Sequence, residues 1–464
     1  MENKKDNIIQ KIIQESRIRD IKNDVSIIDV LREEIVGKLE EKEVVDLIES
    51  YVNKTDLAAK FLDLIPIYYD NSGLWWRWKR IKWELTDETD ILNLVEGCAK
   101  ANIVQSKERT EILNAVKQAA RRNKPKLPKS SWLQFNNEII DIETGERFLA
   151  SPEFFVTNPI PFDLGKSNET PVMDKIFEEW VGKEHVQTLY EIISYCLLPD
   201  YPINRLFCFI GSGLNGKSKF LQLLRKFIGF DNVCSTELDT LIASRFEITR
   251  LHKKLVCQMG ETNFNEMSKT SIIKKLTGGD LIGFEYKNKN PFEEINYAKI
   301  IIATNNLPTT TDKTIGFYRR WLIIDFPNQF TEKKDILADI PEEEYKNLAM
   351  KSIDLLIELL KKKEFHKEGD VKERMAKYEA KSDFLAHFLE EFTKEKIGGY
   401  ISKNDFRKKF NDWCRENRHR EMAEQTLSKA LKKKGIEPGR EQAPWLHEGK
   451  GGQMRVFLDI IWKE

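Results

Sequence analysis

A glycine-rich segment carries the residues in this chain that are best suited to chemistry. Residues 211–218 read Gly-Ser-Gly-Leu-Asn-Gly-Lys-Ser. Glycines allow backbone N–H groups to converge on phosphate oxygens, while the lysine adds positive charge and the serine hydroxyl can bind Mg²⁺. The segment therefore predicts a site for the phosphates of ATP and its Mg²⁺, although a chance glycine-rich turn is the alternative. The predicted ATP-binding residues are Gly211, Ser212, Gly213, Leu214, Asn215, Gly216, Lys217 and Ser218.

The residues on either side of this segment predict the elements that would position it. An apolar run at 206–210 indicates a buried strand, and the apolar spacing at 220–227 indicates an amphipathic helix. A helix that starts at the loop adds a dipole that favours anions. We expect Lys217 to reach the β- and γ-phosphates and Ser218 to be a ligand of Mg²⁺.

Two further polar residues follow apolar runs of the same kind. Glu261 follows the run at 255–259, and Asn305 follows the run at 300–303. Lys217, Glu261 and Asn305 are spaced 44 and 44 residues apart, which in each case suits one helical crossover and a strand. In open α/β sheets, ligands gather where the strands end. Glu261 is thus predicted to bind Mg²⁺ and polarise the attacking water, and Asn305 to contact that water or the γ-phosphate. A surface glutamate and a turn-capping asparagine are the alternatives.

Two adjacent arginines, Arg319 and Arg320, precede another apolar run at 321–326. An ATPase with its site between subunits needs an arginine that reaches the neighbour's γ-phosphate, where it stabilises the charge of the transition state. Either arginine is a candidate for this role. An ordinary ion pair at the edge of a strand is the alternative for each.

Together these motifs resemble the superfamily III helicases, and in particular the phage/plasmid and poxvirus-type primase-helicase family. The similarity covers about residues 130–330. The segment Leu276-Thr-Gly-Gly-Asp280 is the most specific part, because a generic phosphate-binding loop does not predict it. The motifs that carry the resemblance are GSGLNGKS, LVCQMGE, IIKKLTGGDLIGFEYKNKNPFE, IIIATNNLP and FYRRWLIIDFP.

The resemblance implies an AAA+-like ATPase that assembles as a hexameric ring, with ATP between subunits and DNA in the centre. It also implies that residues 283–292 form a hairpin that points into the pore. Lys287 and Lys289 would contact phosphates there, and Tyr286 or Phe292 would stack on a base. A solvated hairpin is the alternative.

Composition limits the classes of protein that fit. The 464 residues include 75 Lys and Arg and 75 Asp and Glu, which excludes a uniformly basic nucleic-acid coat. No apolar run reaches the ~20 residues of a membrane span, and the N-terminal segment lacks the apolar core of a secretory signal. Six scattered cysteines without a C-x-x-C pair favour a reducing compartment. We therefore expect a protein of the cytoplasm of a phage, plasmid or virus host, with no membrane partner.

The expected fold class is α/β, with an AAA+-like P-loop core between a mostly helical N-terminal region and a C-terminal winged-helix-like domain. From about residue 386 to 464, the pattern predicts three helices, a glycine-rich turn and a closing strand (MRVFLDIIW), an order that suits a winged helix. The C-terminal 70 residues, 395–464, carry 16 Lys and Arg against 11 Asp and Glu. A tryptophan-rich stretch at 75–83 reads as a hairpin whose aromatic face is in a core, with base stacking as the alternative. The predicted domains are 1–130 (helical, with the Trp-rich hairpin), 131–200 (family-specific), 201–335 (ATPase), 336–385 (helical connection) and 386–464 (basic, winged-helix-like).

The function predicted from these features is ATP-dependent unwinding of duplex DNA during replication of a mobile element or virus, with single-stranded and forked DNA as the expected partners. The alternative is a DNA-dependent ATPase that loads or remodels a replisome without unwinding. A DNA-binding module with a decayed ATPase fits poorly, since the whole polar set is present. No primase signature is evident, so we expect a primase or polymerase in another chain or in a longer parent protein.

Overall fold

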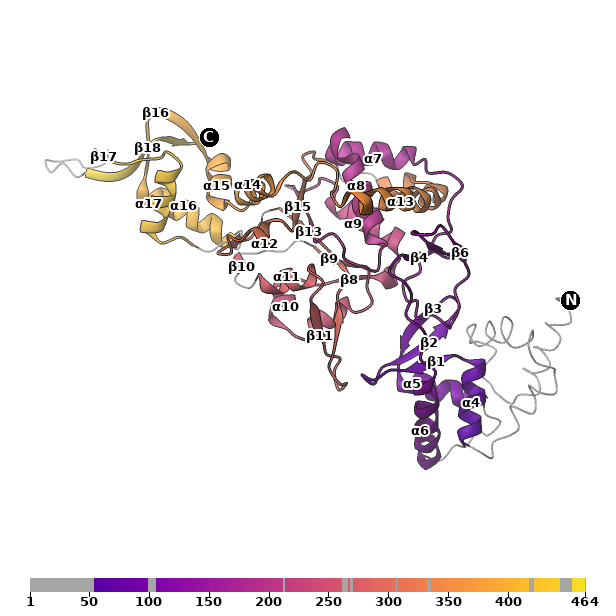
Figure 1. The fold of residues 1–464 in the computed structure, drawn as a ribbon. Coiled ribbons are helices and arrows are strands. Elements are labelled where there is room, and N and C mark those ends of the chain that lie inside the picture. Colours follow the sequence, from indigo (N-terminus) through magenta and orange to yellow (C-terminus); the bar gives the residue numbers. More distant parts are fainter. Residues whose placement is uncertain are drawn as a thin grey trace.

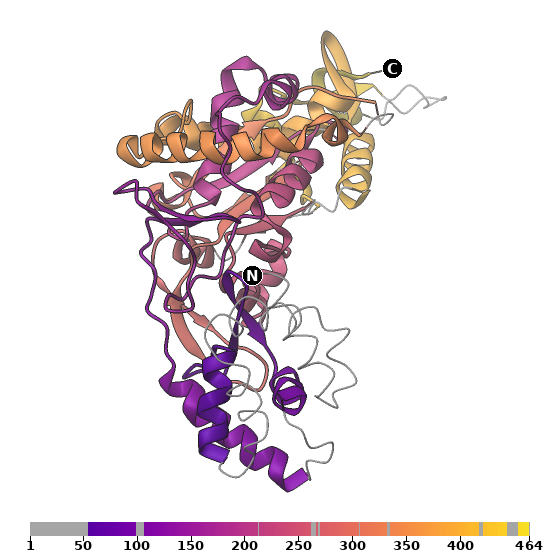
Figure 2. The same ribbon diagram turned by 90° about the vertical axis from the view of Figure 1, so that its right-hand side faces the viewer.

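The computed structural model describes residues 54–98, 106–211, 213–260, 266–267, 270–305, 307–331, 335–416, 421–442 and 453–463 (Figure 1). Figures 1 and 2 place the N-terminal helices and the C-terminal region at opposite ends of the molecule, on either side of a central α/β body. No described helix is long and apolar enough to cross a membrane. The mixed α/β class expected from the sequence is confirmed by this arrangement.

A parallel sheet of five strands forms the centre of the body. Its strands follow the order β15-β7-β13-β9-β8, and every neighbouring pair is parallel. The chain must therefore cross over between strands, as the alternating pattern of the sequence predicts. The strands are β7 (Leu206–Ile210), β8 (Val233–Ser235), β9 (Val256–Met259), β13 (Lys299–Thr304) and β15 (Trp321–Asp325).

Both faces of this sheet are covered, which explains why its strands read as continuous apolar runs. In β7, Phe207 and Phe209 join one core, while Leu206 and Cys208 join the other. The first core includes side chains of α7 (Pro171–Val181), α8 (Val186–Cys196), α9 (Lys217–Ile228) and α13 (Glu342–Lys362). The second includes side chains of α10 (Leu238–Ala243), α11 (Ser271–Leu276), α12 (Ile315–Tyr318) and α14 (Val371–Lys381).

Short elements connect the larger ones. The helical turns are η2 (Lys183–His185), η3 (Phe230–Asn232), η4 (Glu247–Leu251) and η5 (Ile336–Asp339). β10 (Glu266–Met267) pairs in parallel with β14 (Thr309–Thr310), whereas β11 (Leu281–Phe284) and β12 (Phe292–Ile295) form an antiparallel hairpin. Figure 1 shows this hairpin protruding from the body toward the N-terminal region.

The N-terminal region combines three helices with an antiparallel sheet. The helices are α4 (Lys54–Leu64), α5 (Glu88–Cys98) and α6 (Ser106–Arg122), and the strands are β1 (Ile67–Tyr69), β2 (Trp75–Lys79) and β3 (Lys82–Thr86). The side chains of Trp75, Trp76, Trp78 and Trp83 are all buried. The tryptophan-rich stretch is therefore a hairpin with its aromatic side chains in a core, as the sequence predicts. The expected helices before residue 54 lie outside the described residues.

A small antiparallel sheet of β4 (Trp132–Gln134), β5 (Ile139–Asp141) and β6 (Arg147–Phe148) comes between the N-terminal region and the α/β body. It is attached to both. The backbone N–H of Trp83 in β3 donates to the carbonyl of Val156 (2.8 Å), and the Asn158 amide donates to the Asn232 side chain (3.0 Å). The core on one face of the five-stranded sheet also contains Leu133 and Phe135.

The C-terminal region has more strands than the sequence predicts. Three helices occur in the expected order, α15 (Phe384–Phe392), α16 (Lys403–Glu416) and α17 (Glu424–Lys433), followed by the expected last strand β18 (Gln453–Trp462). The sheet also contains β16 (Thr393–Ser402) and β17 (Pro438–Gln442), in the order β16-β18-β17. Both added strands lie at an edge and are polar and largely exposed, so they carry no apolar alternation that would reveal them.

Candidate nucleotide site

The segment predicted to bind phosphate forms a loop between β7 and α9. Gly213 and Gly216 have φ angles of +101° and +92°, a region that glycine adopts without strain. α9 begins at Lys217, directly after Gly216. Ser212 lies outside the described residues. The loop therefore presents its backbone at the start of a twelve-residue helix, where N–H groups and the helix dipole attract anions.

The ammonium of Lys217 lies at the centre of the site. Its Nζ donates to the carbonyl of Gly211 (2.6 Å), to Oδ1 of Asn215 (3.0 Å) and to Oδ1 of Asn305 (3.2 Å), and the side chain is buried. Asn305 directly follows β13, the neighbour of β7 in the sheet. The structure thus brings together Lys217 and Asn305, which are 88 residues apart in the sequence.

A buried donor in the loop has no partner among the described residues. Asn215 is 3% exposed, and its Nδ2 makes no hydrogen bond. An unpaired buried amide costs about 1–3 kcal/mol, so such groups usually serve a purpose. An acceptor oxygen of a bound phosphate would satisfy this donor. The loop residues therefore fit the phosphates of ATP.

The predicted metal ligands are less completely described. Ser218 is exposed in the first turn of α9, next to Lys217. Glu261 lies outside the described residues, although β9 ends at Met259 beside β13, at the same edge of the sheet. Among the described residues, no three His, Cys, Asp or Glu side chains are close enough to hold a metal ion. Mg²⁺ needs few protein ligands when it is bound with a nucleotide, because phosphates and waters complete its shell.

Two groups that the sequence did not reveal support the loop. A Cβ atom at Gly216 would come within 2.5 Å of the Trp180 ring of α7, so the loop packs directly on this indole. The backbone N–H of Phe330 donates to the carbonyl of Leu214 (2.7 Å). Neither Trp180 nor Phe330 belongs to a motif with a recognised spacing, so only the folded chain shows their role.

The two candidate arginines have different environments. Arg320 is 6% exposed, and its guanidinium donates to Thr277 Oγ1 (2.8 Å), to the carbonyl of Lys274 (3.2 Å) and to the carbonyl of Gly316. Burial lowers the pKa of Arg320 from its usual value. Arg319 is exposed, and its guanidinium makes no hydrogen bond or ion pair within the described part of the chain. Arg320 thus holds α11, α12 and the start of β15 together, whereas Arg319 lies at the surface.

The predicted DNA-contacting residues lie at the tip of the β11–β12 hairpin. Lys287 and Lys289 are exposed, and the side chain of Lys289 passes close to Gly73 in the β1–β2 turn. Tyr286 is half-buried. Its hydroxyl is 2.9 Å from Nδ1 of His252, and its ring stacks with Phe292. The two lysines are accessible to a phosphate backbone, while Tyr286 would have to leave His252 to stack on a base.

His252 connects the hairpin to the body. Its Nε2 lies 2.9 Å from Oε2 of Glu294 in β12, and Lys253 also pairs with Glu294. Because an ionised carboxylate only accepts hydrogen bonds, Nε2 of neutral His252 donates to Glu294 and Nδ1 accepts from Tyr286. Burial lowers the pKa of His252, and this effect outweighs the Glu294 carboxylate, which raises it.

We expect the free energy of unfolding to fall as the pH is lowered from about 7 to 5, and part of this fall to come from His252. In this range the unfolded chain takes up a proton on His252 (pKa about 6.5), but the folded chain resists it. Denaturant titrations of the wild type and His252→Gln should show a shallower pH dependence for the variant. Equal slopes in the two proteins would contradict a role for His252.

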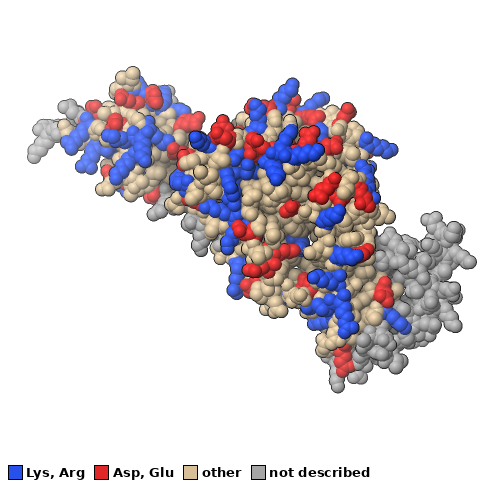
Figure 3. Space-filling view, viewed as in Figure 1, with Lys and Arg blue, Asp and Glu red and all other residues tan. Residues whose placement is uncertain are grey.

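Figure 3 shows Lys and Arg side chains gathered over the C-terminal region, interspersed with a smaller number of acidic groups. The basic residues of α16 and α17 are Lys403, Arg407, Lys408, Lys409, Arg415, Lys429, Lys432 and Lys433. The local excess of positive charge agrees with the basic composition of this end of the sequence.

Two family models match separate segments of the chain. Residues 58–184 match the family model "D5 N terminal like". Residues 209–320 match a family of unknown function, DUF5906, and this range contains the candidate site from Gly211 to Arg320. Neither model covers half of the chain.

The chain is similar to a viral putative helicase. The relative is "Putative helicase L207/L206" of Acanthamoeba polyphaga mimivirus, which is 25% identical over 224 residues, or 45% of this chain. The match covers 23% of that protein, so the chain spans about a quarter of the length of its relative.

Among solved structures, two apo structures of the NrS-1 C-terminal region are similar to this chain. One has a TM-score of 0.43 and 13% identity, and the match covers 85% of this chain and 96% of the chain in that structure. The other has a TM-score of 0.44 and 14% identity, and covers 88% of this chain and 100% of its own.

Proposed function

We propose that this chain is an ATP-driven DNA helicase that acts in the replication of a virus or mobile element. The observation that carries the proposal is the Lys217 ammonium, which joins the loop after β7 to Asn305 after β13. This places a positive charge, a helix N-terminus and an amide at the end of a parallel sheet. The similarity to a viral putative helicase and the sheet order support an AAA+-like core of the superfamily III type.

In the proposed reaction, ATP and Mg²⁺ bind at the loop 211–218. Lys217 would move from its loop acceptors to the β- and γ-phosphate oxygens, which compete well for it because they are charged. Ser218 would ligate Mg²⁺, and Glu261 would polarise the attacking water and contribute to the metal site. Asn305 is close enough to Lys217 to contact the γ-phosphate or that water. Arg319 of a neighbouring subunit would stabilise the charge of the transition state.

The proposed assembly is a homo-hexameric ring around single-stranded or forked DNA. Lys287 and Lys289 would hold the phosphate backbone, and ATP hydrolysis would move their hairpin along the strand. The helices and antiparallel sheet at 384–463 would form a winged-helix-like domain whose basic face binds DNA. A primase or polymerase would act with this chain, either as a separate protein or as part of a longer parent.

A strand-displacement assay tests this proposal. With ATP and Mg²⁺, the wild type should separate a forked DNA duplex. Lys287→Ala combined with Lys289→Ala should lose at least about tenfold in unwinding rate while ATP hydrolysis continues, because phosphate contacts carry the coupling to DNA. The control is Lys361→Ala with Lys362→Ala, which removes two exposed lysines at the end of α13. Unwinding unaffected by the hairpin substitutions would contradict the proposed role of the hairpin.

A DNA-dependent ATPase that loads or remodels a replisome is the second candidate. The contacts of His252 with Tyr286 and Glu294 favour it, since they hold the hairpin to the body, and the side chain of Lys289 at the hairpin tip lies close to Gly73 of the N-terminal region. ATP hydrolysis stimulated by DNA, without strand separation on any forked substrate, would select this candidate over a helicase.

A further inference from the structure

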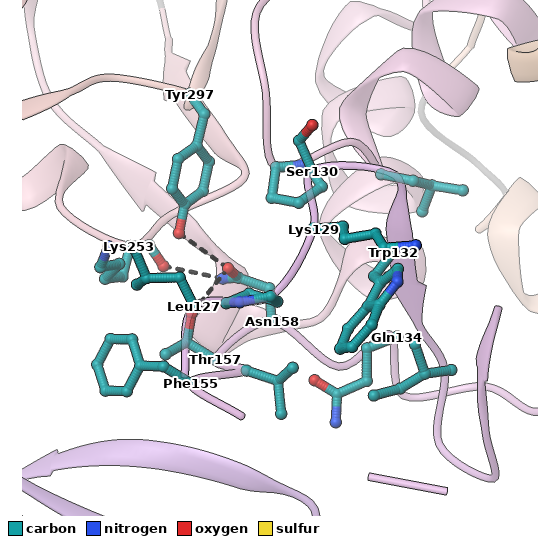
Figure 4. A pocket seen from close by; sticks show the side chains of 15 residues that line it. Leu127, Lys129, Ser130, Trp132, Gln134, Phe155, Thr157, Asn158, Lys253 and Tyr297 are labelled. Carbon is teal, nitrogen blue, oxygen red and sulfur yellow. Dashed lines mark hydrogen bonds between the residues drawn. The ribbon is translucent and has the colours of Figure 1, made fainter. Parts of the chain in front are cut away.

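A cavity of about 150 Å³ lies between the small antiparallel sheet and the α/β body (Figure 4). It is distinct from the nucleotide loop and from the hairpin tip. Its walls come from the segments 127–134 and 155–158, together with Lys253 before β9 and Tyr297 before β13. Figure 4 shows Trp132 and Gln134 on one side of it, and Asn158, Thr157 and Phe155 on the other.

Gln134, one of the residues that line this cavity, has an unsatisfied buried acceptor. The residue is 7% exposed, and its Oε1 makes no hydrogen bond among the described residues. Its Nε2 donates to the carbonyl of Ile81, which fixes the orientation of the amide. A buried acceptor without a partner is costly, so a ligand that donates a hydrogen bond would be favoured here.

The side-chain amide of Asn158, which also lines the cavity, has hydrogen-bond partners at both its nitrogen and its oxygen. Nδ2 of Asn158 donates to Asn232 (3.0 Å) and to the carbonyl of Lys253 (2.9 Å). Its Oδ1 accepts from Thr157 (2.9 Å) and from the hydroxyl of Tyr297 (2.9 Å). Asn158 is thus fully used in joining the two walls, which leaves Gln134 as the group suited to read a ligand.

The other lining groups suit a flat ring attached to a phosphate. Trp132, Phe155 and Tyr297 supply aromatic surface, and Lys129 and Lys253 line the cavity. Lys129 also pairs with Asp141 (2.9 Å), which lies behind the lining. Lys129 belongs to the stretch 117–130, which has six basic residues and no acidic one. Lys253 also pairs with Glu294 in β12, so the cavity lies beside the base of the hairpin.

We propose that this cavity binds one base of a single DNA strand, and that it prefers a base with an exocyclic amine. Oε1 of Gln134 would accept a hydrogen bond from the amine of cytosine, adenine or guanine, which thymine lacks. The aromatic side chains would contact the ring, and Lys129 would lie near the adjacent phosphate. This inference rests on the proposed function in that its ligand is DNA, but it involves no ATP.

Binding of labelled 20-nucleotide strands, followed by fluorescence anisotropy without ATP, tests the inference. The wild type should bind oligo-dC about tenfold more tightly than oligo-dT, because a thymine in the same position places its O4 acceptor where cytosine places its amine, and so leaves the buried acceptor of Gln134 unpaired. In Gln134→Leu this preference should vanish, with the affinity for oligo-dT unchanged. Gln187→Leu, which changes an exposed glutamine of α8 that does not line the cavity, should behave like the wild type. A wild type without preference, or a preference that survives in Gln134→Leu, would overturn the inference.

A change in the ligand provides a test that does not depend on the folding of a variant. A strand of N4,N4-dimethylcytosine has no amine hydrogen to donate, and should bind the wild type as weakly as oligo-dT does. Binding as tight as that of oligo-dC would overturn the inference. Displacement of the strand by free dCMP at the same concentration of bases would assign the cavity to a free nucleotide instead. The binding assay contains no ATP, whereas the strand-displacement assay requires it. A loss of base preference can therefore be told apart from a loss of unwinding.

Discussion

Replacing Lys217 with alanine should lower the rate of ATP hydrolysis by at least about 100-fold, the usual scale for losing a group that stabilises charge in the transition state. The Lys217 ammonium is buried and bonded to three oxygens, so it is already positioned where phosphate oxygens would arrive. Without it, the negative charge that develops on the transferred phosphoryl group would lose its nearest cation in this subunit. Steady-state phosphate release with and without single-stranded DNA measures the effect.

The control for this prediction is Lys219→Ala. Lys219 lies on the same helix two residues further on, but it is half-exposed and pairs with Asp335 at the surface (2.9 Å). Its removal should change turnover by less than about twofold, because exposed ion pairs contribute little. Thermal unfolding of both variants separates lost chemistry from lost folding. Full turnover in Lys217→Ala, or an equal loss in Lys219→Ala, would contradict the assignment of the site.

The central sheet could be predicted from the sequence because each of its main strands is a run of apolar residues buried on both faces. β7, β9, β13 and β15 all have this character, and the loop after β7 has a spacing that is specific for phosphate binding. The edge strands β16 and β17 escaped prediction because they are polar and exposed, so that pairing with β18 rather than burial defines them.

Roles that depend on contacts distant in the sequence could not be predicted. The aromatic residue Tyr286 in a basic hairpin suggests base stacking, but its partner His252 is 34 residues away and gives no local signal. Trp180 supports the nucleotide loop from α7 without belonging to a motif. The unsatisfied acceptor of Gln134 likewise depends on the fold, because the carbonyl of Ile81 accepts from Nε2 of Gln134 and so leaves Oε1 as the atom without a partner. Glu261 stays a prediction, since it lies outside the described residues.

Arg319→Ala should lower ATP turnover, whereas Arg320→Ala should lower the stability of the fold, although the two residues are adjacent and chemically identical. Arg320→Ala should lower the free energy of unfolding by about 3 kcal/mol, because it leaves the carbonyls of Lys274 and Gly316 and the hydroxyl of Thr277 without their donor. Arg319→Ala should leave the midpoint of thermal unfolding unchanged and reduce ATP turnover about 10³-fold, as expected for an arginine that acts from a neighbouring subunit. Denaturant titration and phosphate release measure the two effects.

Mixing two inactive variants shows whether Arg319 acts on its own subunit or on a neighbour. Lys217→Ala subunits have an intact Arg319, and Arg319→Ala subunits have an intact loop. In a head-to-tail ring of equal amounts, about a quarter of the interfaces would combine the intact loop of one subunit with the intact arginine of the next. Turnover should therefore reappear on mixing, at a level far above that of either variant alone. If the mixture stays inactive although the subunits assemble, Arg319 does not act across an interface. The guanidinium of Arg320 is hydrogen-bonded within its own subunit, so Arg320 could contact a neighbour only by breaking these bonds. Recovery of turnover on mixing would therefore assign the role across the interface to Arg319 and not to Arg320.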